Sequence, residues 1–113
     1  MVDIKDLLEK PPEPEPVIWD LLHRVDDPEI GVNIVDLGLV RGLRVEPNGD
    51  IHVEMTLTSP SCPLGPYIRD EIAGVLGETS WAGNLDMEIV WDPPWNPQTD
   101  MSEKAKRALG WIP

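Results

Sequence analysis

The sequence predicts a small α+β domain in which helices cover one face of a three-stranded mixed sheet. Apolar and polar residues alternate over 51–57 and 85–91, as in strands with one buried face. Other apolar residues recur every three or four positions, as in amphipathic helices. The resulting order, α-β-β-α-β-α, fits a two-layer α/β sandwich with short crossings.

The length of 113 residues predicts one domain, because a second core would need a longer chain. Residues 1–16 combine five acidic residues with Pro11, Pro12, Pro14 and Pro16. This composition favours an extended, flexible chain over packed structure. We therefore expect a tail over 1–16 and a single domain over 17–113.

The first predicted elements are a helix and a hairpin. Helical spacing of apolar residues predicts a helix over 17–25, which Pro28 ends because the residue before a proline avoids the α region. Strands over 39–45 and 51–57 flank the turn 46–50. Within that turn, Asn48-Gly49 supplies the positive φ angles of a tight hairpin.

The second half of the chain predicts a helix, a strand and a short final helix. An apolar stripe marks a helix over 63–76 that covers the sheet. Alternation predicts the third strand over 85–91. The last helix, over 102–109, has Ser102 as its N-cap and Gly110 after its end.

The net charge of −12 argues against nucleic acids and anionic membranes as partners. The basic residues are spread over separate segments and offer no basic patch. The sequence has neither a secretion signal nor an apolar run of membrane-spanning length. With only one cysteine, it forms no internal disulfide, and we expect a cytoplasmic protein with a free thiol.

That cysteine, Cys62, lies between the second strand and the following helix, at or beside the helix N-cap. Free N–H groups and the helix dipole favour thiolate there, the form that attacks electrophiles and binds metals. The alternative is that Cys62 is a small buried apolar residue. Pro60 and Pro63 fix the backbone around it, which favours the functional interpretation.

Two further segments carry candidate residues. Carboxylates over 26–36 could reach the Cys62 loop, although the pattern by itself favours an Asx-type turn, a cap and solvated charges. The loop 91–97 holds Trp91 and Trp95 among prolines. It favours a lid over the core edge, although an exposed tryptophan would also suit a partner interface. His23 and His52 show no metal-ligand spacing with Cys62 and are expected at the surface.

Four motifs occur in a familiar order: Asp27-Pro28-Glu29, residues 33–40 (NIVDLGLV), residues 58–64 (TSPSCPL) and residues 91–95 (WDPPW). Together they resemble the metal-sulfur cluster biosynthesis family that includes SufT and PaaD-like proteins, from about Val17 to Trp111. The resemblance implies a compact domain that carries iron-sulfur clusters or delivers them to recipient apo-proteins, working with the assembly machinery. It implies Cys62 as the cluster ligand, supported by Asp27, Glu29, Asp36 and Thr58. Ser61 departs from the family, which often has glycine there.

One thiol limits how this chain could hold a cluster, because such clusters usually take four protein thiolates. A symmetric homodimer would bring two, with the rest from glutathione, a carboxylate or a partner protein. Binding would then be labile, and a purified protein could lack the cluster. Two alternatives stay open: a metal-free adaptor that uses Trp91 and Trp95 for interaction, and a thiol-dependent enzyme, although a carrier fits the residues better than an enzyme.

Overall fold

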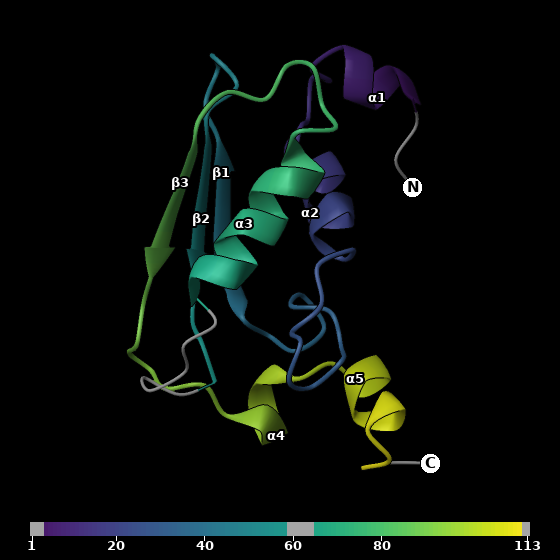
Figure 1. Ribbon diagram of the computed structural model, residues 1–113, viewed down its shortest axis with the longest axis vertical. Helices are drawn as coiled ribbons and strands as arrows, with labels where there is room; N and C mark the ends of the chain where they lie inside the picture. The colour runs from purple at the N-terminus through teal and green to yellow at the C-terminus, as the bar shows by residue number, and fades with distance from the viewer. Residues whose placement is uncertain (1–3, 59–64, 112–113) are drawn as a thin grey trace.

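The structure is a computed structural model that describes residues 4–58 and 65–111. Figure 1 shows the order of the elements along the chain. The described elements are α1 (Ile4–Leu8), α2 (Glu15–Leu22), β1 (Val40–Val45), β2 (Ile51–Met55), α3 (Gly65–Leu76), β3 (Leu85–Ile89), α4 (Pro97–Asp100) and α5 (Glu103–Ala108).

The strands of the described residues form one sheet in the order β1-β2-β3. β1 and β2 are antiparallel, whereas β2 and β3 are parallel, so the predicted mixed sheet is confirmed. The hairpin and all three strands lie where alternation placed them, each ending within two residues of the expected bounds. A register shift between Val40 and Gly42 inserts Arg41 as an extra residue at the start of β1.

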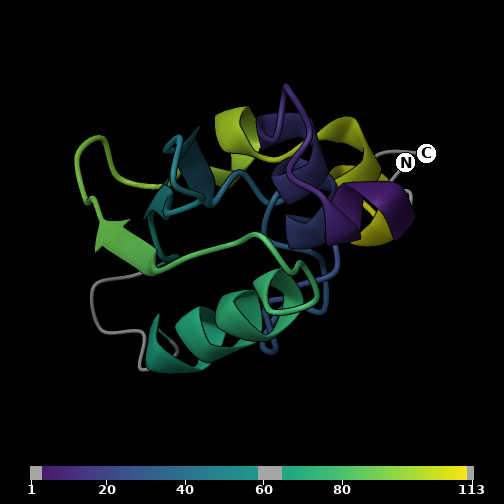
Figure 2. The same cartoon turned by 90° about the horizontal axis from the view of Figure 1, so that it is seen from above.

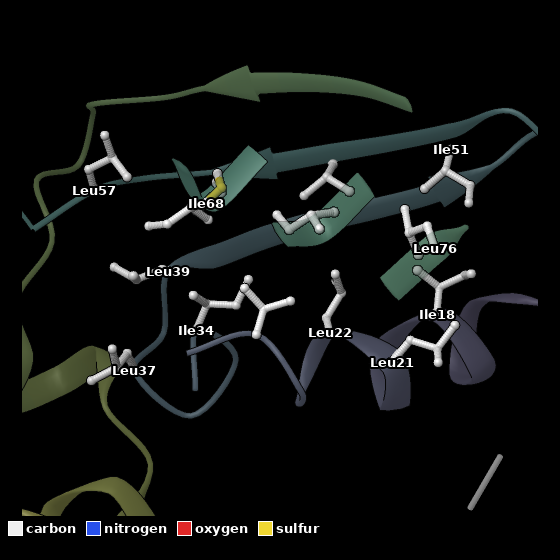
Figure 3. Packing of buried hydrophobic residues seen from close by; sticks show 14 of the residues in the cluster. Ile18, Leu21, Leu22, Ile34, Leu37, Leu39, Ile51, Leu57, Ile68 and Leu76 are labelled. Atoms are coloured by element: carbon white, nitrogen blue, oxygen red, sulfur yellow. The ribbon is translucent and has the colours of Figure 1, made fainter. Parts of the chain in front are cut away.

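The core lies between the sheet and the helices α2 and α3, as Figures 1 and 2 show. Along β2, the side chains of Ile51, Val53 and Met55 are buried, and the intervening His52 and Glu54 point away from the core. Figure 3 shows the apolar residues of both helices facing this inner surface. The predicted two-layer arrangement, with helices on one face, is therefore confirmed.

The predicted extended tail is wrong in its conformation, because residues 4–16 contain α1 and the start of α2. The indole Nε1 of Trp81 donates to the carbonyl of Asp6 at 2.6 Å, and the amide of Ser80 donates to that of Leu7 at 2.7 Å. Leu7 packs against the core. These contacts join residues more than seventy positions apart, so local composition could not reveal them.

The hairpin turn between β1 and β2 packs on the segment that leads into β3. Gly49 has φ +93°, and a Cβ there would overlap the carbonyl oxygen of Trp81. The amide of Gly83 donates to the carbonyl of Gly49 at 2.8 Å. Gly49 is therefore needed both for its backbone angle and for the close approach of a second loop.

The final helix begins and ends close to the predicted bounds. Ser102 is its N-cap, accepting from the amide of Ala105 at 3.1 Å, and Gly110 follows with φ +79°. Just before it, the short helix α4 was not predicted, although Asn96 caps it by accepting from Gln98. None of the helices in the described residues combines the length and the apolar character needed to cross a membrane.

Candidate functional site

Cys62 and Ser61 lie outside the described residues, as does the predicted helix start at Pro63. The ends of this segment are described. Thr58, half-buried, precedes it, and Gly65 begins α3 after it. A Cβ built on Gly65 would lie 3.5 Å from Leu57 Cδ1, so the chain returns close to the point from which it leaves.

The segment leaves the sheet where all three strands are still joined. The amide of Thr56 donates to the carbonyl of Leu39 at 2.8 Å on one side, and the amide of Val90 donates to that of Met55 at 2.8 Å on the other. Thr56 and Leu57 are buried. Because both neighbouring strands hold this end of β2, it is a rigid base for the cysteine segment.

Asp27 is buried, with 2% of its surface exposed. Its Oδ1 accepts from the amides of Glu29 at 2.9 Å and Ile30 at 3.2 Å, which makes an Asx-type turn. The turn closes when the amide of Asp27 donates to the carbonyl of Val32. The alternative of a structural turn is therefore confirmed for Asp27, whereas Glu29 is exposed.

Asp36 ties the turn 33–38 to the C-terminal end of the chain. Its Oδ2 accepts from Asn33 Nδ2 at 2.6 Å and its Oδ1 from the hydroxyl of Ser102 at 3.0 Å, while Lys104 Nζ lies 3.9 Å from Oδ2. Burial raises the pKa of Asp36, but these hydrogen bonds and the charges of His23 and Lys104 outweigh it. The pKa therefore lies below its ordinary value, and the carboxylate stays ionised.

Residues 36, 37 and 38 each hold part of residues 95–102, which we call the C-terminal strap. The amide of Ser102 donates to the carbonyl of Asp36, and Trp95 Nε1 donates to that of Leu37, both at 2.7 Å. Gly38, with φ +78°, lies so close to Asp100 that a Cβ would overlap the Asp100 carbonyl. The interpretation of Trp95 as part of a lid over the core edge is confirmed, whereas Trp91 is 42% exposed.

Sequence reasoning did not single out two residues near this end of the sheet. Arg41 is mostly buried, its Nη1 has no hydrogen-bond partner among the described residues, and its Nη2 lies 4.0 Å from Asp100 Oδ2. Tyr67 lies in the first turn of α3, where a hydrogen bond to Glu71 and the charge of Glu71 raise its pKa. An arginine at a bulge has no local sequence signal, and neither does an exposed tyrosine on a helix.

The described residues bring together no set of three His, Cys, Asp or Glu side chains that could hold a metal ion. The carboxylate oxygens of Asp27 and Asp36 already accept hydrogen bonds, from backbone amides, an asparagine and a serine. His52 lies on the outer face of the sheet, with Nδ1 3.0 Å from Asp86 Oδ2 and Nε2 3.5 Å from Glu46 Oε1. Within the described residues, neither His23 nor His52 completes a set of three potential metal ligands with Asp27 or Asp36.

Comparisons with known proteins point in one direction. The iron-sulfur cluster assembly protein family matches residues 15–86. An Fe-S protein maturation auxiliary factor of Bacillus subtilis, YitW, is 45% identical over 82% of this chain and 90% of its own length. The factor SufT of Staphylococcus aureus is 48% identical over 76% of this chain and 97% of its own.

Solved structures agree with this match. A domain of unknown function, DUF59, from Bacillus anthracis has a TM-score of 0.81 at 36% identity, covering 87% of this chain and 92% of that one. A conserved hypothetical protein from Thermotoga maritima has a TM-score of 0.73 at 31% identity, covering 90% and 98%. The fold is therefore shared with these proteins over most of its length.

Proposed function

Because this chain belongs to the iron-sulfur cluster assembly protein family, we propose that it helps to mature iron-sulfur proteins by delivering clusters to recipient apo-proteins. The observation that carries this proposal is the match to maturation factors at 45% and 48% identity over nearly their whole length. The cluster is cargo in this proposal. The chain receives it from the assembly machinery and passes it on.

Cys62 is the residue we propose as the cluster ligand, because it is the one thiol in the chain. A single thiolate leaves most of the iron coordination to a second copy, to a small thiol or to the recipient. Such incomplete coordination suits transfer, since the recipient's own cysteines can replace the weaker ligands one at a time. A thiol that must stay reduced suits the cytoplasm.

The acidic residues support this site through the backbone rather than as ligands. Asp27 and Asp36 hold the turns on either side of the bridge between Asp26 and Asn33, and Asp36 also holds the C-terminal strap. Thr58 leads directly into the cysteine segment. Mutating these residues should therefore weaken cluster binding mainly by lowering stability.

Anaerobic reconstitution tests the proposal. The full chain, incubated with ferrous iron and sulfide, is expected to gain visible absorbance and then to pass the cluster to an apo-ferredoxin. Cys62→Ser, which nearly keeps the side-chain volume but replaces the thiol with a hydroxyl, is expected to lose both, while its thermal unfolding stays unchanged. Full absorbance and transfer with Cys62→Ser would rule out Cys62 as the ligand.

A metal-free adaptor is the second candidate, favoured by the exposure of Trp91 beside the anchored Trp95. An adaptor would retain its partners after Cys62→Ser and lose them after Trp91→Ala. Affinity purification of the chain from its native cells, with each variant, separates the two functions. Loss of the same partners with Cys62→Ser alone would favour the carrier.

A further inference from the structure

β3 is an edge strand of the described sheet, with β2 on one side and no described strand on the other. In Figures 1 and 2 no helix or strand lies beyond it. It is five residues long and contains no proline or glycine. Natural proteins usually protect such an edge, because its free N–H and C=O groups can pair with another strand.

The outward backbone groups of β3 can be identified from its pairing with β2. The carbonyl of Asn84 accepts from the amide of Ile51, and the amide of Val90 donates to the carbonyl of Met55. The backbone N–H and C=O groups of the even-numbered residues of this segment therefore point toward β2. Alternation then turns the backbone groups of Leu85, Met87 and Ile89 toward the free edge. Within the described part of the chain, no partner is found for these three amides.

The outer face beside this edge is acidic. Glu54, Asp86 and Glu88 line a hollow of about 410 Å³ on that face, together with Arg44 and His52. Arg44 and His52 already have acidic partners, since Arg44 Nε lies 2.7 Å from Glu46 Oε1 and His52 contacts Asp86. Glu88 and Asp86 are exposed on the edge strand itself. An added strand would place its own outward side chains next to these carboxylates.

The negative charge beside β3 distinguishes two possible binding partners for this edge, a second copy of the chain and a basic strand of another protein. A second copy pairing through β3 would set Asp86 and Glu88 against the same residues of its partner, and like charges in neighbouring strands oppose pairing. The chain as a whole carries a net charge of −12, which adds to the repulsion. A strand with lysine or arginine at alternate positions would instead meet opposite charges.

We propose that the free edge of β3 binds an extended, basic segment of a partner protein as a fourth strand. The amides and carbonyls of Leu85, Met87 and Ile89 supply the backbone hydrogen bonds. Asp86, Glu88 and Glu54 select the basic side chains of the incoming strand. The proposal concerns an edge that does not include Cys62, so it stands or falls independently of cluster binding.

A synthetic peptide of alternating lysine and valine, capped at both ends, is the probe. Titrated into the ¹⁵N-labelled full chain, it is expected to shift the amide resonances of residues 85–89 and to slow hydrogen exchange at Leu85, Met87 and Ile89. The same peptide N-methylated at the valines, which removes backbone donors on one edge, is expected to bind about tenfold more weakly. A glutamate and valine peptide is expected not to bind.

Two variants test the protein side. Met87→Pro removes an outward N–H that the sheet does not use and is expected to weaken binding about tenfold. Asp86→Asn with Glu88→Gln is expected to weaken it by a similar factor at low salt, while Glu9→Gln with Glu13→Gln removes as much charge elsewhere and leaves it unchanged. Should Met87→Pro fail to fold by circular dichroism, the charge variants decide.

Several outcomes would overturn the proposal. These are amide resonance shifts centred on elements other than β3, or an N-methylated peptide that binds as tightly as the unmodified one. The same holds if the two double charge variants weaken binding equally, or if no binding is seen at millimolar peptide. The cluster-binding experiment on Cys62→Ser has a separate readout. Its failure would leave the β3 edge unaffected, and the reverse also holds.

Discussion

Two groups of carboxylates in this chain differ in what their oxygens contact. Asp27 and Asp36, in the turns before β1, are mostly buried and accept hydrogen bonds from amides, an asparagine and a serine. Glu54, Asp86 and Glu88, on the outer face of the sheet, are exposed, and among the described residues the Asp86 carboxylate contacts only the side chain of His52 on the neighbouring strand. The first group therefore builds the fold, while the second remains available for recognition. Acidity alone does not distinguish them, but the partners of the oxygen atoms do.

The largest expected effect tests whether the turn 33–38 is structural. Gly38→Ala places a Cβ on the carbonyl of Asp100 at a positive φ, so we expect a loss of about 3 kcal/mol in the free energy of unfolding. Urea denaturation followed by tryptophan fluorescence measures it. Gly74→Ala is the control, since no atom of the described residues lies within 4 Å of the added Cβ. Because alanine favours helix, this variant should be more stable by about 0.5 to 1 kcal/mol.

Asp27→Ala should lower the free energy of unfolding by about 2 kcal/mol, because two amides lose their acceptor inside a buried turn. Glu29→Ala, two residues away but exposed, should change the free energy of unfolding by less than about 0.5 kcal/mol. Chemical denaturation of the three proteins provides the comparison. Equal losses in the two variants would erase the distinction between built-in and available carboxylates.

Asp36→Asn should lower the free energy of unfolding by about 1 kcal/mol at neutral pH, because the ionised carboxylate of the original chain accepts from Asn33 and Ser102. The pKa of Asp36 is lowered in the folded chain, so its contribution is present above the ordinary value of 3.8 and is lost as pH falls through the lower folded value. The gap between the two proteins should therefore narrow below pH 3.8. A gap that stays constant in acid would mean that charge is not the cause.

The smallest stability effect is expected on the outer face. Glu88→Gln should leave the free energy of unfolding within about 0.5 kcal/mol of the original, because the side chain is exposed. The same change should weaken binding of the lysine and valine peptide. A large loss of stability would show that Glu88 belongs with Asp27 and Asp36 after all.

Features written in short stretches of sequence were predictable. Asn48-Gly49 marked the hairpin, and alternation along β2 and β3 showed which side chains face the core. The turn at Asp27 was one of two open interpretations, because an aspartate that caps its own turn looks the same in sequence as one that faces a ligand. Its burial, which decides the matter, depends on elements far away in the chain.

Features that depend on distant partners were not predictable. The helix α1 is held by Ser80 and Trp81, and the C-terminal strap is held by residues 36–38. Arg41 is mostly buried and lies at a bulge, and the alternation of the strand does not predict that bulge. The role of Cys62 as a ligand stays a prediction, since that residue lies outside the described part of the chain.

The C-terminal strap has a consequence for the chain during its synthesis. The sheet strands and the helices α2 and α3 precede Trp95 and Ser102, so they can leave the ribosome while both of these residues are still unmade. Until then the Leu37 carbonyl and the Asp36 carboxylate have only water in place of those two partners. A nascent chain that stops short of Ser102 would therefore expose the turn 33–38 without its C-terminal strap to chaperones and proteases. Synthesis of residues 95–102 supplies the missing contacts.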